Sequence, residues 1–407
     1  MIKNISQKIE AILIYLNQKQ WMVLTIFFLL WTVCTLSYWK KYEWNPSSMV
    51  NFGKEFANRN KDLTPNNAIL FLGEKGDLGA GYDGQIFYYF SVPLSNFSME
   101  WPKGFDESYR APRIGYPFLI GIFGLFGKSF AVFGMYFWNL TLILISYFCL
   151  RSMLSSDSKR YSIFYLLSPF ALGSYYVLVS DSVMVSLLII AYFLLQRRKY
   201  TFFVIVSSLA ILTKEPALFF LFPLGLKSLT EKNVKKSVAV AFTLLIPILW
   251  HLYLSHKFPN WRATRLTDFI LPFEGMITYS ETIWRTWNET ESLKELARLF
   301  SRFPLLILFF MGVILSFTGN LKRGWEFRIA ILLTMFMIGT AGYYHFWSVY
   351  ENVSRMFTLS IPMIIFLKDQ DHLAKVGEFF SLVFIILLLF ILKAVVISKP
   401  LLYQVGF

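Results

Sequence analysis

Charged residues are scarce in this 407-residue sequence: only 16% are Asp, Glu, Lys or Arg, whereas 56% are hydrophobic. A water-soluble globular domain carries about 25% charged residues, so the composition excludes that class. Cysteine is also scarce, because Cys34 and Cys149 are the only two. Both lie within apolar runs, which argues against a disulfide framework and against a cysteine-based metal site. The four histidines show no His-x-x-x-His spacing, which argues against a zinc centre.

Nucleotide-binding motifs are absent or out of context. The chain has no G-x-x-x-x-G-K-[ST] motif, which argues against ATP-driven transport by this chain alone. Gly79-x-Gly81-x-x-Gly84 fits the dinucleotide pattern G-x-G-x-x-G, but no βαβ unit surrounds it and Pro93 soon follows. We therefore discard this match. The net charge of +14 does not indicate a nucleic-acid partner, because basic residues in a membrane protein first determine its orientation.

Long apolar runs and aromatic residues are abundant instead. A transmembrane helix needs about 20 apolar residues, and residues 21–39 meet this requirement. They show no small-residue cleavage site, so we expect a retained span rather than a signal peptide. Residues 1–20 alternate isoleucine with lysine at helical spacing, which predicts a cytoplasmic interfacial helix. Further apolar runs occupy 130–150, 163–180, 183–196, 237–254, 303–319, 329–347 and 380–398.

Three other apolar runs, at 116–127, 201–226 and 357–367, have unusual lengths for a span. Lys214-Glu215-Pro216 interrupts the second run, which predicts two shorter helices that meet inside protein or beside a water-filled cavity. The sequence therefore predicts an all-α polytopic membrane protein with about 10–12 transmembrane helices. A single transmembrane domain would cover residues 21–398, followed by a tail at 399–407.

Basic clusters mark alternate connections between the apolar runs. They are Arg151/Lys159/Arg160, Arg197/Arg198/Lys199, Lys227/Lys232/Lys235/Lys236 and Lys322/Arg323/Arg328. The positive-inside rule places these connections and the N-terminus in the cytoplasm. The two long loops, 40–115 and 255–302, are then extracytoplasmic, and we expect the first to be catalytic.

Several ionisable residues fall at the predicted outer ends of the apolar runs. Such groups are costly at membrane depth and usually face a functional cavity. We single out Asp83 and Asp181 as candidate catalytic residues. The candidates for binding a donor or substrate are Tyr82, Gln85, Arg110, Arg113, Lys214, Glu215, His345, Glu351 and Arg355. A carboxylate beside arginines suits glycosyl transfer from a lipid-phosphate sugar, because the acceptor hydroxyl needs a base and the departing phosphate needs positive charge.

Each candidate also has a purely structural interpretation. Asp83 could form the polar corner of a Gly-rich turn, and Asp181 could cap the helix after it. The Lys-Glu pair that interrupts the run 201–226 could be self-satisfied. Arg355 could be an interface anchor and His345 an ordinary interfacial histidine.

The order of five short motifs resembles that of the GT-C class of integral-membrane glycosyltransferases, especially bacterial multi-spanning relatives of the GPI mannosyltransferases. The motifs are Tyr82-Asp83-Gly84-Gln85, Arg113-Ile-Gly-Tyr-Pro, Ser180-Asp181-Ser182, Leu212-Thr213-Lys214-Glu215 and the late Arg355. The resemblance implies that Asp83 is the catalytic base and that Arg355 contacts the donor phosphate. It departs from the family at Lys214, where the similar element has arginine.

The resemblance implies a hexosyltransferase that takes a sugar from a polyprenyl-phosphate donor, with inversion, and passes it to an extracytoplasmic glycan, lipid or protein acceptor. We expect it in the bacterial inner membrane, among the enzymes of cell-envelope glycan biosynthesis. A divalent metal shared by Asp83 and Asp181 stays open. So do two other functions: a flippase or secondary transporter for lipid-linked saccharides, and an O-antigen ligase or polymerase. No internal repeat supports a transporter, and the Asp-bearing loop comes early for a ligase.

Overall fold

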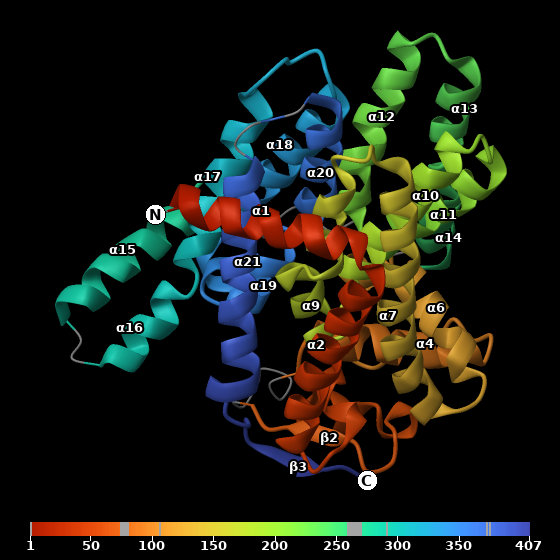
Figure 1. Cartoon of the computed structure of the whole chain (residues 1–407). Helices are drawn as coiled ribbons and strands as arrows, with labels where there is room; N and C mark the ends of the chain where they lie inside the picture. Colours follow the sequence, from red (N-terminus) through yellow and green to blue (C-terminus); the bar gives the residue numbers. More distant parts are fainter. Residues whose placement is uncertain are drawn as a thin grey trace.

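Helices dominate the computed structural model of this protein, which describes residues 2–73, 81–105, 107–258, 271–289, 292–371, 373 and 376–407. Within these ranges the helices pack into a bundle, and a small three-stranded sheet lies at one end of it (Figure 1). Of the predicted loop 255–302, residues 259–270 and 290–291 lie outside the described part, as does Gly79 of the discarded motif.

Four helical segments of the described chain are long and apolar enough to cross a membrane. They are α2 (Gln20–Lys40), α7 (Lys128–Met153), the segment Val234–Lys257 and the segment Val376–Ile397. The third consists of α13 (Val234–Phe242) and α14 (Leu245–Lys257), and the fourth of α21 (Val376–Leu392) and η6 (Lys393–Ile397). Shorter apolar helices are α6 (Gly115–Gly124), α10 (Asp181–Gln196), α11 (Tyr200–Thr213) and α17 (Phe303–Phe317). This composition indicates a membrane protein.

The other α-helices are α1 (Ile2–Gln18), α3 (Lys54–Arg59), α4 (Asp83–Ser95), α5 (Glu107–Arg110), α8 (Ser162–Leu166), α9 (Pro169–Tyr176), α12 (Leu218–Thr230), α15 (Glu274–Glu289), α16 (Leu293–Phe300), α18 (Trp325–Gly339), α19 (Tyr350–Arg355) and α20 (Ser360–Asp371). Short single turns are η1 (Pro46–Val50), η2 (Lys61–Leu63), η3 (Lys159–Tyr161), η4 (Glu215–Ala217) and η5 (Tyr343–Trp347). In Figure 1, α15 and α16 project as an arm from the side of the bundle.

Two apolar runs that the sequence predicts as single segments are broken in the structure. The run 163–180 divides into α8 and α9, because Pro169 cannot donate a backbone hydrogen bond and Ser168 caps α9 through its hydroxyl. The run 329–347 ends as a helix at Gly339 and continues as the separate turn η5. The predicted break in 201–226 is confirmed, since α11 ends before Lys214 and α12 begins after η4.

The two ends of the bundle carry different segments. At one end, α1 contacts predicted cytoplasmic basic residues: Arg151 donates to Asn17 at 2.6 Å, and Arg160 lies 2.6 Å from Glu10. At the other end, the end of α2 contacts the start of η6, where Lys41 donates to the Ala394 carbonyl at 2.8 Å. The basic end and the end of α2 therefore lie on opposite sides of the bundle.

The C-terminal segment is a strand rather than a simple tail. β3 (Tyr403–Val405) pairs antiparallel with β2 (Ile69–Phe71), and β2 pairs parallel with β1 (Phe52–Gly53). The backbone amide of Leu401 also donates to the Tyr42 hydroxyl. The chain therefore ends beside the predicted first extracytoplasmic loop, away from α1 (Figure 1).

A buried arginine caps one of the apolar helices. Arg328 on α18 donates to the Ser316 and Thr318 carbonyls at 3.0 and 2.6 Å, at the C-terminal end of α17. Its other nitrogen pairs with Asp371 of α20. The sequence analysis placed Arg328 only among cytoplasmic basic residues, whereas the structure gives it a role in joining three helices.

Candidate active site

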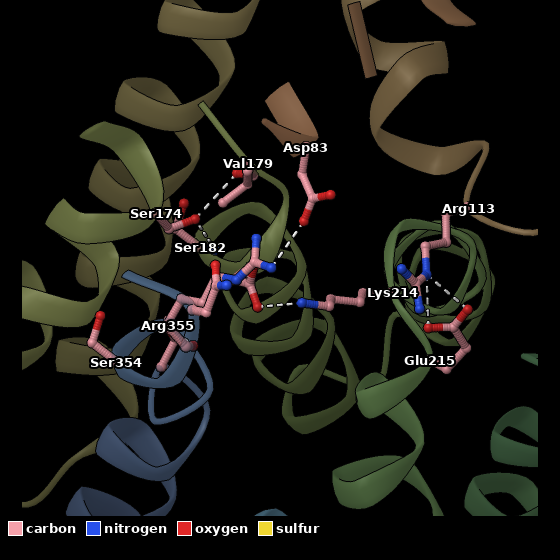
Figure 2. Close-up of polar contacts among 12 residues, drawn as sticks. Asp83, Arg113, Ser174, Val179, Ser182, Lys214, Glu215, Ser354 and Arg355 are labelled. Atoms are coloured by element: carbon pink, nitrogen blue, oxygen red, sulfur yellow. Dashed lines mark hydrogen bonds and ion pairs between the residues drawn. The ribbon is translucent and has the colours of Figure 1, made fainter. Parts of the chain in front are cut away.

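Asp83 is the first residue of α4, and arginines from two distant segments share its carboxylate. Oδ1 lies 2.8 Å from Arg110 at the end of α5, and Oδ2 accepts from Nη2 of Arg355 at 2.8 Å. An acid at the start of a helix and a base at its end are both favoured by the helix dipole, and Arg355 ends α19. Figure 2 shows Asp83 and Lys214 pointing toward Arg355. The Asp83 carboxylate therefore pairs with two arginines and is not simply the polar corner of a Gly-rich turn.

Asp181 is the first residue of α10 and lies on the opposite side of Arg355. Oδ1 accepts from Nζ of Lys214 at 2.5 Å, and only 6% of the side chain is exposed. Oδ2 lies 4.0 Å from Nη1 of Arg355 and has no hydrogen-bond partner among the described residues. The residue before the helix, Ser180, makes no side-chain cap either. The helix-cap interpretation of Asp181 is therefore wrong, because its carboxylate faces the basic side chains.

These five side chains form one charge cluster, which we call the Asp83 cluster: Asp83, Arg110, Asp181, Lys214 and Arg355. Three cations and two anions leave a net charge of +1, which favours binding of an anion. Burial disfavours the ionised Asp83 carboxylate, but Arg110 and Arg355 outweigh this cost and hold the pKa of Asp83 well below its usual range. Asp83 is thus firmly ionised and is a weak proton acceptor in this arrangement.

A tight approach of three segments fixes the position of Asp83. A Cβ added at Gly84 would lie 2.7 Å from the Val177 carbonyl and 2.8 Å from the Val50 carbonyl, so only glycine fits there. Leu178, next to Val177, has a φ of 46° and is fully buried. Such a left-handed conformation costs about 1–3 kcal/mol for a non-glycine residue and is common at functional sites. The start of α4 and the turn before α10 are therefore in close backbone contact.

Ser174 of α9 stabilises the turn that carries Asp181 through two hydrogen bonds. Its hydroxyl donates to the Val179 carbonyl at 3.1 Å and accepts from the Ser182 amide at 3.2 Å (Figure 2). The Ser182 hydroxyl donates to Asn139 of α7 at 2.7 Å. These contacts place the first turn of α10 beside Arg355.

A second ion pair lies next to the Asp83 cluster. Nε of Arg113 donates to both carboxylate oxygens of Glu215 at 2.9 and 3.0 Å (Figure 2). Lys214 pairs with Asp181 instead, so the self-satisfied Lys-Glu interpretation is wrong. The Tyr109 ring contacts both arginines of its segment, with its centroid 4.6 Å from the Arg110 guanidinium and 4.2 Å from that of Arg113.

The Tyr82 ring lies beside Arg355, and Asn352 binds the hydroxyl of that ring. The Arg355 guanidinium lies 5.3 Å from the centroid of the Tyr82 ring, and the Tyr82 hydroxyl donates to the Asn352 side chain. Only 11% of the Arg355 side chain is exposed, so the interpretation of Arg355 as an anchor at the membrane interface is wrong. The sequence analysis missed Asn352 and Tyr109. Asn352 precedes Arg355 by three residues on one helix, and this spacing is the signal that could have indicated it.

Two further predicted site residues, Gln85 and Glu351, pair with residues outside the Asp83 cluster. Gln85 accepts from the Gly53 amide at 2.8 Å, so it joins α4 to β1. Glu351 pairs with Lys393. The side chain of His345 lies outside the described part of the structure.

Charge compensation between the two aspartates comes from a guanidinium. Arg355 lies between Asp83 and Asp181, where the sequence analysis considered a shared divalent ion. Within the described ranges, no three His, Cys, Asp or Glu side chains gather closely enough to hold a metal. These carboxylates, each already paired with a cation, do not fit a metal site in this arrangement.

No protein-family model, curated protein or solved structure matches this chain. Its function is therefore argued from the site.

Proposed function

We propose that this chain is a GT-C-type membrane glycosyltransferase that uses a polyprenyl-phosphate sugar and an extracytoplasmic acceptor. The observation that carries the proposal is the position of Arg355 between Asp83 and Asp181, with Arg110 and Lys214 beside them. The arrangement combines a carboxylate for the acceptor hydroxyl with three cations for a phosphate. The resemblance of the surrounding motifs to the GT-C class supports the same activity.

The chemistry needs one base and one stabilised leaving group. The acceptor oxygen attacks the anomeric carbon while the bond from that carbon to the phosphate oxygen breaks, which inverts the anomeric centre. Asp83 takes the hydroxyl proton, and the phosphate leaves with the bonding electron pair. Arg355, Arg110 and Lys214 stabilise its charge, so no carboxylic acid is needed to protonate the leaving group. Asp181 holds Lys214 and orients Arg355.

The distribution of elements supports an outward-facing site. Arg151 and Arg160 lie at the end of the bundle with α1, which the positive-inside rule assigns to the cytoplasm. The end of α2 and the C-terminal strand lie at the opposite end, so an odd number of crossings connects the two termini. We propose an odd number of crossings within the predicted range of about 10–12, with the shorter helices accommodated by local thinning and by the packing of their neighbours.

Exposed aromatic and aliphatic side chains support a lipid substrate and a bilayer environment. On α7 the exposed residues include Phe130, Phe133, Ile145 and Phe148. A polyprenyl chain packs against such a surface while its phosphate reaches the Asp83 cluster.

Sugar transfer in lipid vesicles tests the proposal. The purified protein is incubated with a panel of radiolabelled polyprenyl-phosphate sugars and an extract of envelope glycans, lipids and proteins as acceptors. We expect label to move from one donor to an acceptor. In Asp83→Asn that is still folded and inserted in the membrane, we expect turnover to fall by about 10²–10⁴-fold.

The matched control is Asp369→Asn, which removes a carboxylate at the cytoplasmic end, where Asp369 accepts from the Ser155 amide. It should leave turnover unchanged. Full turnover by Asp83→Asn would eliminate Asp83 as the base. Movement of intact donor between leaflets without transfer would instead identify a flippase.

A further inference from the structure

The arrangement of Asp83 conflicts with its proposed role as a base. Both of its oxygens are engaged at 2.8 Å, one by Arg110 and one by Arg355. A carboxylate in two charge-assisted hydrogen bonds has little tendency to take a proton from a hydroxyl. Some change in the Asp83 cluster must therefore precede proton transfer.

Arg355 has a second acceptor toward which it can turn. Oδ2 of Asp181 is buried and lacks a hydrogen-bond partner among the described residues, and Nη1 of Arg355 lies 4.0 Å away. That distance is too long for a hydrogen bond, so a shift of about 1 Å toward Asp181 would complete one. An unpartnered buried carboxylate oxygen is costly, and the shift would remove this cost.

We propose that the Asp83 carboxylate occupies the anion site of the cluster in the empty enzyme, and that the donor phosphate replaces it there. The phosphate takes the hydrogen bonds of Arg110 and of Nη2 of Arg355, while Nη1 closes on Asp181. Asp83 is released as a base only when the donor is in place. The inference rests on the proposed function and deepens it, because it predicts that the donor binds before the acceptor is activated.

The charge of the cluster fits this exchange. With Asp83 ionised the cluster carries +1, and a phosphodiester contributes a single negative charge. Without the Asp83 carboxylate the same three cations face only Asp181. Removing that carboxylate should therefore strengthen phosphate binding, although it abolishes the base.

Equilibrium binding of radiolabelled decaprenyl phosphate to the full-length protein in nanodiscs tests the proposal. We expect Asp83→Asn and Asp83→Ala to bind it at least about fivefold more tightly than the wild type, because the arginines no longer need to leave a carboxylate. Arg355→Ala should bind it more weakly. Asp369→Asn, at the opposite end of the bundle, should bind it as the wild type does. The unfolding temperature of each variant is measured in the same nanodiscs, and two substitutions at Asp83 guard against failure of one to fold.

The outcomes separate this inference from the proposed function. Equal or weaker binding by folded Asp83 variants, with normal binding by the wild type, would overturn the exchange and leave the donor site in place. No saturable binding of decaprenyl phosphate to any variant would overturn the donor proposal itself. Inorganic phosphate is the second arm: we expect it to compete with decaprenyl phosphate only weakly, and equally strong binding of both would contradict a lipid donor.

Discussion

The Asp83 carboxylate and the Arg355 guanidinium come from opposite ends of the sequence, 272 residues apart, yet they form the central ion pair of the site. The helix dipole favours each residue at its own helix end, but only the fold brings the two together. Asp83 is partly exposed and loses the hydration of its carboxylate, which the two arginines replace. The two arginines thus stabilise an anion at this position, which is consistent with a role in binding a ligand of the same charge.

The depressed pKa of Asp83 predicts how stability depends on pH. The folded-state pKa lies below that of the unfolded chain, which is about 3.9, so the stabilising contribution is fully present above that value. It is lost as the pH falls toward the folded-state pKa. The wild type should therefore lose unfolding temperature below about pH 4, and Asp83→Asn should lose less over the same interval.

Thermal unfolding in detergent between about pH 7 and pH 3 measures this difference. The wild type and Asp83→Asn share the other acidic residues of the site. The difference between their two curves therefore gives the contribution of Asp83 to the pH dependence. Parallel curves for the wild type and Asp83→Asn would show that Asp83 is not held by the arginines.

At the scale of elements, the close contact of α4 with the turn before α10 determines where Asp83 lies. Gly84→Ala would place a methyl group 2.7 Å from the Val177 carbonyl, so one backbone segment must move. We expect a loss of about 1–3 kcal/mol in the free energy of unfolding and a fall in turnover beyond what the loss of folded protein explains. Turnover per folded molecule and chemical unfolding provide the measurement.

The matched control for Gly84 is Gly173 of α9. A Cβ there would lie 3.8 Å from its nearest neighbours, an ordinary van der Waals distance. Gly173→Ala should therefore leave turnover unchanged. If Gly84→Ala behaves like this control, the tight contact does not position the site.

Arg328 gives a second prediction at this scale, one that concerns stability rather than activity. Arg328→Ala would remove the cap of α17 and leave the Asp371 carboxylate buried without its partner. We expect a loss of about 3–5 kcal/mol in the free energy of unfolding, with the turnover of the remaining folded protein retained. Arg323→Ala, an exposed residue of the same connection, is the control and should change stability little. Equal unfolding midpoints would contradict the capping role.

Sequence patterns predicted most helices but not all of their breaks. The interruption at Lys214 was visible because a charge and a proline fall within an apolar run. The break at Pro169 was missed because the residues around it are as apolar as the helices themselves. The fate of residues 399–407 was missed for a different reason: a three-residue strand depends on the partner β2, which periodicity in the tail does not reveal.

The partners within the site were harder to predict than its members. Charge at the ends of apolar runs was enough to indicate Asp83, Asp181, Lys214 and Arg355. The same criterion also selected Glu351, which pairs with Lys393 instead. Proximity along the chain does not determine the direction of a side chain, and the contacts of Arg355 depend on the packing of four separate segments. The catalytic roles of these residues stay predictions.

At the scale of the whole molecule, the account requires a membrane between the basic end of the bundle and the sheet. Single cysteines at Gln404 in β3 and at Lys322 in the connection after α17, introduced after replacing Cys34 and Cys149 by serine, test this orientation. A membrane-impermeant maleimide should label the cysteine at 404 from outside intact spheroplasts and the one at 322 only after permeabilisation. Labelling of position 322 in sealed cells would contradict the proposed orientation and indicate the opposite one.

The small sheet is joined to the Asp83 cluster through α4. β1, beside which Gln85 anchors α4, belongs to the same sheet as the C-terminal strand. The C-terminal strand thus meets the first long loop, and Arg355 reaches the same loop from α19. This convergence explains how residues of a mostly apolar bundle form one polar site.

The central claim is that the Asp83 cluster binds the phosphate of a lipid-linked sugar. Its most direct test is an electron cryo-microscopy structure of the protein in nanodiscs saturated with a polyprenyl-phosphate sugar that it accepts as a donor. We predict phosphate density within hydrogen-bond distance of Arg355 and Arg110, with the Asp83 carboxylate no longer paired to Arg355 and open to the acceptor. Phosphate bound elsewhere, with the Asp83–Arg355 pair intact, would contradict the account.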